Sequence, residues 1–135
     1  MAGCVILAPP RLEREWRRIE GPEGNPIALM TWRLPRAGGG EADAEAPRPA
    51  AVLCHGISCS KELMTTLAHD LAREGFAVVA HDFAGHGESP ARPLTEDANA
   101  ADTLAVIEWV RARPDVDPDR VVLAGHSMGA VAAAL

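Results

Sequence analysis

The chain has 135 residues, of which 47% are hydrophobic and 24% charged, and its formal net charge is −6 at pH 7. These proportions are typical of a globular protein that forms one domain or part of one. The acidic balance argues against a protein that binds the nucleic-acid backbone, and no apolar run reaches the ~20 residues of a membrane span.

The first third of the chain predicts little regular structure apart from one hairpin. Residues 1–15 combine a short apolar run with two prolines and charged residues, and we expect a disordered lead-in there. Residues 16–19 and 27–34 predict two strands around a segment rich in turn formers, which gives an antiparallel hairpin. Residues 35–49 contain three consecutive glycines and predict a loop.

From residue 50 onward, short apolar runs alternate with helical patterns. The runs at 50–54, 76–80 and 120–124 show no clean polar alternation and predict strands buried on both faces. The two helices between them begin after Ser60 and Thr95, which are predicted N-caps. Their expected apolar faces are Leu63, Met64, Leu67 and Leu71 in the first helix and Ala101, Leu104, Ile107 and Val110 in the second.

This alternation predicts an α/β fold, with a parallel sheet covered by helices on both faces and preceded by the N-terminal hairpin. The last predicted strand leads at once into an Ala-rich helix that reaches Leu135 without a residue that ends helices. We therefore expect residues 16–135 to be the N-terminal, incomplete part of one domain.

The sequence Gly125-His126-Ser127-Met128-Gly129 fits the pattern Gly-x-Ser-x-Gly between a predicted strand and a predicted helix. A strand that reverses sharply into a helix strains the backbone of the residue in the bend, and it leaves room only for small residues two positions before and after. The bend raises the Ser127 hydroxyl above the carboxyl ends of the strands, where ligands bind in open α/β sheets. Ser127 is thus a candidate nucleophile, and a structural serine is the alternative.

A second candidate segment follows the first buried strand, at His55-Gly56-Ile57. A tight turn there directs the Ile57 backbone N–H toward the space above Ser127, and the Met128 N–H supplies a second donor. Two such donors stabilise the oxyanion in acyl transfer. The alternative interpretation is an ordinary glycine turn in which His55 only forms hydrogen bonds.

A third segment, from Asp82 to Ser89, follows the second buried strand and contains Gly85 and Gly87. The preferred interpretation is that Asp82 and His86 brace this loop by hydrogen bonds. In the alternative, His86 acts as a catalytic base.

In these three segments, residues 50–135 resemble the front half of the α/β-hydrolase superfamily. The Gly125-His126-Ser127-Met128-Gly129 turn is similar to the nucleophile turn of monoacylglycerol lipases and related esterases. The resemblance implies that Ser127 is the nucleophile and that the Ile57 and Met128 N–H groups form the oxyanion hole. It assigns a supporting role to His55, Gly56, His86, Gly87, Gly125 and Gly129. The family's acid and histidine follow the nucleophile in the chain, so we expect them beyond Leu135 and expect these 135 residues alone to be inactive.

The resulting hypothesis is a serine hydrolase that cleaves a small-molecule ester, thioester or amide through an acyl-enzyme on Ser127. The alternative is a truncated product without catalysis, or an interaction module that uses the same fold. No organic cofactor is implied, and Cys54, His55 and Cys59 match no common zinc spacing, so no metal is expected. Three cysteines give no disulfide framework, which favours a cytoplasmic location. The oligomeric state is not predicted.

Overall fold

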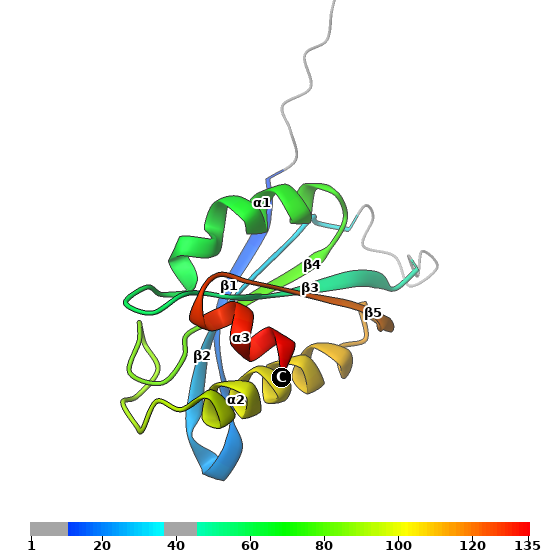
Figure 1. Ribbon diagram of the computed structural model, residues 1–135. Coiled ribbons are helices and arrows are strands. Elements are labelled where there is room, and N and C mark those ends of the chain that lie inside the picture. Colours follow the sequence, from blue (N-terminus) through cyan, green and yellow to red (C-terminus); the bar gives the residue numbers. More distant parts are fainter. Residues whose placement is uncertain (1–10, 37–45) are drawn as a thin grey trace, which may run out of the picture.

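The computed structural model describes residues 11–36 and 46–135 (Figure 1). Its strands are β1 (Glu13–Glu20), β2 (Pro26–Arg33), β3 (Arg48–Cys54), β4 (Ala77–His81) and β5 (Val116–Gly125). Its helices are α1 (Thr65–Arg73), α2 (Glu96–Arg111) and α3 (Met128–Ala134), with short 3₁₀ segments η1 (Pro22–Gly24) and η2 (Lys61–Met64).

The five strands form one mixed sheet in the order β1-β2-β4-β3-β5. Strands β1 and β2 pair antiparallel as the predicted hairpin, and β2 continues antiparallel against β4. Strand β3 pairs parallel with β4 on one side and with β5 on the other. The parallel part therefore brings the loops after β3, β4 and β5 to one end of the sheet, where Figure 1 shows them together.

Helix α1 covers one face of the sheet, and α2 and α3 cover the other (Figure 1). Successive strand residues point to opposite faces, so each strand contributes to both layers. In β3, Val52 and Cys54 pack in the cluster that contains Val106 of α2, whereas Leu53 packs in the cluster that contains Ala68 of α1. The predicted α/β fold with helices on both faces and a preceding hairpin is confirmed.

Two predicted boundaries differ from the structure. Strand β1 begins at Glu13, so the end of the predicted disordered lead-in 1–15 is a strand, paired residue by residue with β2. Strand β3 begins at Arg48, inside the predicted loop 35–49. Residues 1–10 and 37–45, which make up most of those two predictions, lie outside the described residues.

The predicted helix faces are partly wrong, because the contact with the sheet includes small side chains where the pattern predicts bulky ones. Met64 is buried and Leu71 packs against the core, as predicted, but Leu63 is 57% exposed and Leu67 is also exposed. Helix α1 itself buries Ala68 and Ala72. Small side chains at the contact allow the helix axis to lie close to the sheet. The Ser60 side chain caps no helix; its hydroxyl donates to Glu62 Oε2 at 2.6 Å.

Helix α2 begins as predicted, because Thr95 Oγ1 accepts the Ala98 N–H at 3.1 Å. Its buried face agrees with the prediction in part: Val110 is buried and Ile107 packs against the core, whereas Leu104 is 55% exposed. The residues that α2 buries are Asn99, Asp102, Thr103, Val106 and Val110.

The prediction that residues 120–124 are buried on both faces was wrong. In the part of the chain that the structure describes, β5 is an edge strand that pairs only with β3, and Val122 is 49% exposed. Strand β5 also begins earlier than predicted, at Val116, with an irregularity in its pairing to β3 between Arg48 and Ala50.

Candidate active site

Ser127 stands at the junction of β5 and α3, in a backbone conformation that few residues with a side chain adopt. Its φ of 54° and ψ of −119° place it in the positive-φ half of φ/ψ space, outside both the strand and the helix regions. The preceding His126 N–H donates to Cys54 O at 3.0 Å and fixes the bend against the end of β3. The sharp strand-to-helix turn expected from the sequence is therefore present, and Ser127 is exposed at its apex.

The glycines on either side of the bend are required by close backbone contacts. A Cβ at Gly125 would lie 2.3 Å from Gly129 O, and a Cβ at Gly129 would lie 2.2 Å from Cys54 O. Both contacts are with main-chain atoms, which cannot move aside as a flexible side chain can. The crowding that the sequence predicted around the bend thus extends to the end of β3.

The loop after β3 lies directly against this bend. A Cβ at Gly56 would be 2.9 Å from His126 Nδ1 and 3.4 Å from Ser127 Cβ, so only glycine fits without a shift. The next residue, Ile57, is 61% exposed. Ile57, Ser127 and Met128 line one hollow of about 240 Å³.

Two backbone donors border this hollow. Within residues 46–135, neither the Ile57 N–H nor the Met128 N–H donates a hydrogen bond. Met128 is the first residue of α3, where an N–H has no partner in its own helix. Two unpaired donors beside one serine hydroxyl form an arrangement that can bind a negatively charged oxygen.

Asp82 and Gly87 organise the loop after β4. Asp82 is fully buried, and its carboxylate accepts the backbone N–H groups of Lys61 at 2.7 Å and Glu88 at 2.9 Å. Gly87 has a φ of +51°, and a Cβ there would overlap Asp82 Oδ2 at 2.2 Å. Asp82 therefore braces the loop after β4 by hydrogen bonds, as expected from the sequence.

Lys61 completes this buried cluster and was missed by the sequence analysis. Its ammonium group, which is fully buried, lies 2.6 Å from Asp82 Oδ2 and 2.7 Å from Glu88 Oε2. Desolvation would lower the pKa of Lys61, but its hydrogen bonds with these carboxylates prevail and raise it above the ordinary value. One signal was available, since Lys61 is the only lysine of the chain and begins a helical segment, where a cation is unfavourable.

His55 and His86 use all their ring nitrogens on backbone groups. His55 Nδ1 lies 2.7 Å from Gly56 O, and its Nε2 accepts the Phe83 N–H at 3.2 Å. His86 Nδ1 lies 2.9 Å from Ala84 O, and its Nε2 accepts the Ser58 N–H at 3.2 Å. Burial lowers the pKa of His55. Because both of its nitrogens are occupied, His86 is not arranged as a base for Ser127.

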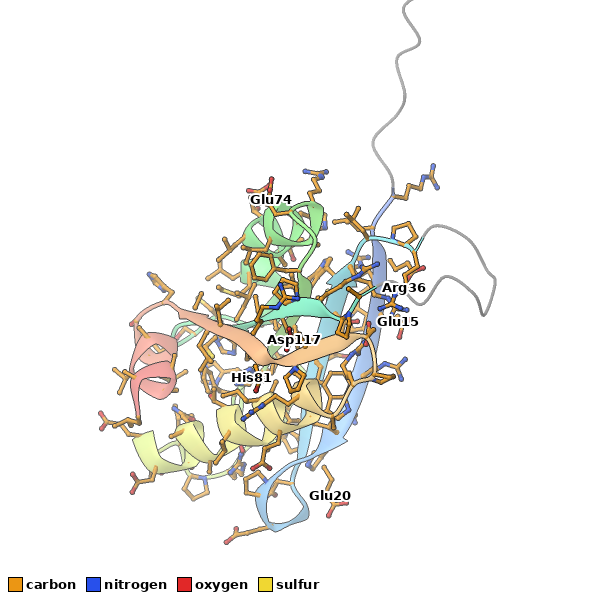
Figure 2. All side chains as sticks on the ribbon, turned by 90° about the vertical axis from the view of Figure 1, so that its right-hand side faces the viewer. Glu15, Glu20, Arg36, Glu74, His81 and Asp117 are labelled. Atoms are coloured by element: carbon orange, nitrogen blue, oxygen red, sulfur yellow. The ribbon has the colours of Figure 1, made fainter. Side chains whose placement is uncertain are left out.

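His81, the last residue of β4, and the following Asp82 are both fully buried. His81 lies between the sheet and α2 (Figure 2), with its ring centroid 4.7 Å from that of Phe83. Burial lowers the pKa of His81 to about 3, so the ring is neutral at pH 7. Asn99 of α2, missed from the sequence, lines the hollow beside Ser127, and its buried Oδ1 has no partner among the described residues.

No group of three or more His, Cys, Asp or Glu side chains within residues 11–36 and 46–135 is arranged to hold a metal ion. Burial raises the pKa of the Cys54 thiol to about 11, so this side chain is a neutral part of the core. The helices of the described residues are too short or too polar to cross a membrane.

Comparisons with known proteins agree with this architecture. A sequence model of the family described as "Serine aminopeptidase, S33" matches residues 45–135. An uncharacterized protein of Mycobacterium tuberculosis is 35% identical over 115 residues, which cover 85% of this chain and 38% of that protein. The chain thus spans less than two fifths of the length of this relative.

Solved structures show the same fold. The Xanthomonas campestris protein XC6422, described as an α/β serine hydrolase without a lid, is 31% identical with a TM-score of 0.67, and the match covers 89% of this chain and 53% of that one. The Pyrococcus furiosus esterase Pf2001 is 22% identical with a TM-score of 0.72, covering 90% and 44%. Together with the family match over residues 45–135, these likenesses show that the chain belongs to the α/β-hydrolase superfamily, in the family described as serine aminopeptidase S33.

Proposed function

We propose that this chain carries the nucleophile and the oxyanion hole of a serine hydrolase that cleaves a small-molecule carboxylic ester, thioester or amide. Ser127 is the nucleophile, and the backbone N–H groups of Ile57 and Met128 bind the oxyanion. One observation carries the proposal: the strained Ser127 and these two residues, with unpaired N–H groups, line the same hollow. The description of XC6422 as a serine hydrolase supports it.

In the first step, Ser127 Oγ attacks the substrate's carbonyl carbon while its proton passes to a general base. The carbonyl π electrons move to oxygen, and the Ile57 and Met128 N–H groups bind the resulting oxyanion. When the oxyanion collapses, the bond to the alcohol, thiol or amine breaks, and the leaving group takes up a proton. Water then hydrolyses the Ser127 ester by the same steps and restores the hydroxyl.

The general base is not assigned to a histidine of the loops after β3 and β4. His55 and His86 bind backbone groups through both ring nitrogens, and His81 is buried. In the superfamily the acid and the histidine follow the nucleophile in the chain. We propose that the complete protein supplies them in that order and that turnover belongs to the complete protein.

We also propose a cytoplasmic location. Cys54 and Cys59 are both free thiols, and Cys54 is buried. A reducing compartment keeps such thiols in this form.

A fluorophosphonate probe, which reacts covalently with activated serines, tests the proposal on the full-length protein. We expect stoichiometric labelling of wild type and none of Ser127→Ala, with ester turnover reduced by about 10⁶-fold in the variant. Ser60→Ala is the matched control, because the Ser60 hydroxyl is bound to Glu62 Oε2 and lies outside the hollow; it should label like wild type. Equal labelling of wild type and Ser127→Ala would contradict the proposal and favour a protein without serine catalysis.

A further inference from the structure

His55 and His86 join the loop that carries Ile57 to the loop after β4. Their four ring nitrogens bind four backbone groups, two in each loop: Gly56 O and Ser58 N–H in the first, Phe83 N–H and Ala84 O in the second. The two rings lie against each other, with centroids 5.2 Å apart. We call this pair the histidine clamp.

Resting on the function proposed above, we infer that His86 is a positioning residue for the oxyanion hole. It fixes the Ile57–Ser58 peptide, which directly follows the Gly56–Ile57 peptide that carries the Ile57 N–H, and it does so only as the neutral Nδ1–H tautomer. His86 touches no reacting atom in this inference. It acts through Ser58, whose N–H it accepts.

The hydrogen-bond partners determine the tautomer. A carbonyl oxygen accepts at Nδ1 and a backbone N–H donates at Nε2, so each ring must carry its proton on Nδ1 and a lone pair on Nε2. A protonated ring carries N–H on both nitrogens. Protonation of His86 would therefore place an Nε2–H against the Ser58 N–H and break the bond between the two loops.

The Ile57–Ser58 peptide depends on this bond because little else holds it. The Ile57 side chain is largely exposed, so it makes few packing contacts. Ser58 has a φ of 59°, which a residue with a side chain adopts only when its surroundings hold it there. The preceding Gly56–Ile57 peptide is held at its carbonyl, because Gly56 O lies 2.7 Å from His55 Nδ1 and accepts the Cys59 N–H at 3.3 Å. The bond from the Ser58 N–H to His86 fixes the chain on the other side of the Ile57 Cα, while the Ile57 N–H itself has no partner in residues 46–135.

The charged groups of the two loops gather around one cation. Lys61, after β3, pairs with Asp82 and Glu88 of the His86 loop and with Glu62 at 3.1 Å, so three carboxylates share one ammonium group. The ring that faces His86 most closely is His55, which burial keeps neutral by lowering its pKa. His86 is the more exposed member of the clamp.

Three variants of the full-length protein test the inference. His86→Phe keeps a ring but has no acceptor, His86→Gln offers a non-titrating amide oxygen to the Ser58 N–H, and His69→Gln changes a histidine on α1 outside the clamp. With p-nitrophenyl acetate, we expect kcat of His86→Phe to fall by about 10- to 100-fold at little change in KM, somewhat less than the ~10²–10³ that removal of an oxyanion donor costs. His86→Gln should recover most of this loss, because its amide oxygen can accept the Ser58 N–H, and His69→Gln should match wild type.

A folded His86→Phe with wild-type kcat would overturn the inference, as would a His86→Gln that is as slow as His86→Phe. Long-range ¹H–¹⁵N NMR of the histidine rings provides a readout that needs neither activity nor a variant. We expect Nδ1–H and bare Nε2 for both His55 and His86 at pH 8, and Nε2–H on His86 would overturn the inference. If wild type shows no Ser127-dependent turnover, the proposed function fails instead, and the NMR spectrum still decides the clamp.

Discussion

At the scale of single residues, Lys61 and Asp82 form an ion pair at 2.6 Å inside the described part of the chain. Both side chains are fully buried, and Asp82 also holds two backbone N–H groups. Breaking an isolated buried pair costs about 3–5 kcal/mol. Without the Asp82 charge, Lys61 keeps only the half-exposed Glu88 and Glu62 as partners, so the cost should lie at the lower end, about 3 kcal/mol. We therefore expect Asp82→Asn to lower the free energy of unfolding by about that amount in urea denaturation.

Asp70→Asn is the matched control, because Asp70 pairs with Arg73 on the surface of α1 at 3.9 Å with both side chains more than half exposed. Its effect should stay within about 0.5 kcal/mol. The double variant Lys61→Met/Asp82→Leu should cost less than the sum of its single changes, since neither charge remains buried alone. An Asp82→Asn protein as stable as wild type would show that the pair contributes nothing.

His81 should make the stability of the fold depend on pH. Its pKa is lowered from 6.5 to about 3, first by burial and then by the nearby His55. Between those pH values the unfolded state binds a proton that the folded state does not, so stability falls as the pH decreases below 6.5. From this residue we expect a loss of about 2 kcal/mol between pH 7 and pH 5.

Urea denaturation of wild type and His81→Gln at both pH values measures this contribution. The variant should lose about 2 kcal/mol less than wild type over the same interval, because it has no ring to protonate. His69→Gln, on α1, should keep the full wild-type dependence. If wild type and His81→Gln lose the same stability, the ring is not held neutral by burial.

How far the sequence predicted the site depends on how local each interaction is. Ser127, Gly125 and Gly129 form one bend, and the constraint among them could be derived from their spacing alone. Lys61 and Asp82 are 21 positions apart, and His86 meets Ser58 across 28 positions. Such contacts follow from the order of strands in the sheet, so the sequence predicted that Asp82 and His86 brace a loop but not what they bind.

At the scale of secondary-structure elements, the sequence predicted which helices and strands exist better than which faces they bury. Periodicity placed α1 and α2 correctly, but it assigned the core contact to Leu63, Leu67 and Leu104, all exposed. The interfaces instead use alanine in α1 and a mixture of valine and polar residues in α2. Among the polar ones is Thr103, whose buried hydroxyl donates to Asn99 O within the helix at 2.9 Å. Hydrophobicity alone does not indicate a face whose contact is close or hydrogen-bonded.

The junction of β5, α3 and β3 depends on the absence of a side chain at position 129. In Gly129→Ala the new Cβ would lie 2.2 Å from Cys54 O and 2.6 Å from His55 O, and neither main-chain atom can move without disturbing the end of β3. We expect a loss of more than about 2 kcal/mol in unfolding free energy, at the upper end of typical overpacking costs.

Gly75→Ala is a suitable control because it introduces only the strain of a side chain at positive φ, without a steric clash. Gly75 has a φ of +95°, and a Cβ added there would meet no atom within 4 Å, so alanine introduces strain without a clash. Its cost should stay near ~1 kcal/mol. The fluorophosphonate reaction adds a functional readout, since Gly129→Ala should slow labelling of Ser127 and Gly75→Ala should not. Equal effects of the two variants would mean that the close packing at Gly129 contributes nothing.

At the scale of the whole molecule, the two edge strands of the sheet differ in the side chains that they expose. The sheet begins with the charged strand β1, whose side chains include Glu13, Arg14 and Glu15. It ends with β5, whose exposed apolar residues Val122 and Leu123 have no neighbouring strand beyond them in residues 11–36 and 46–135. The sequence pattern of residues 120–124 is that of an interior strand, which explains why it was predicted to be buried.

An unpaired apolar edge presents free backbone groups to other chains, and natural proteins often protect such edges with charge. We therefore expect the 135-residue chain to self-associate with rising concentration, measured by static light scattering, and Val122→Lys to reduce this association. Leu63→Lys is the control, because Leu63 is similarly exposed (57% against 49% for Val122) but lies in η2 away from any strand edge. Since the added charge is the same, a difference between the two variants reports on the edge itself, and equal effects would assign the association to net charge.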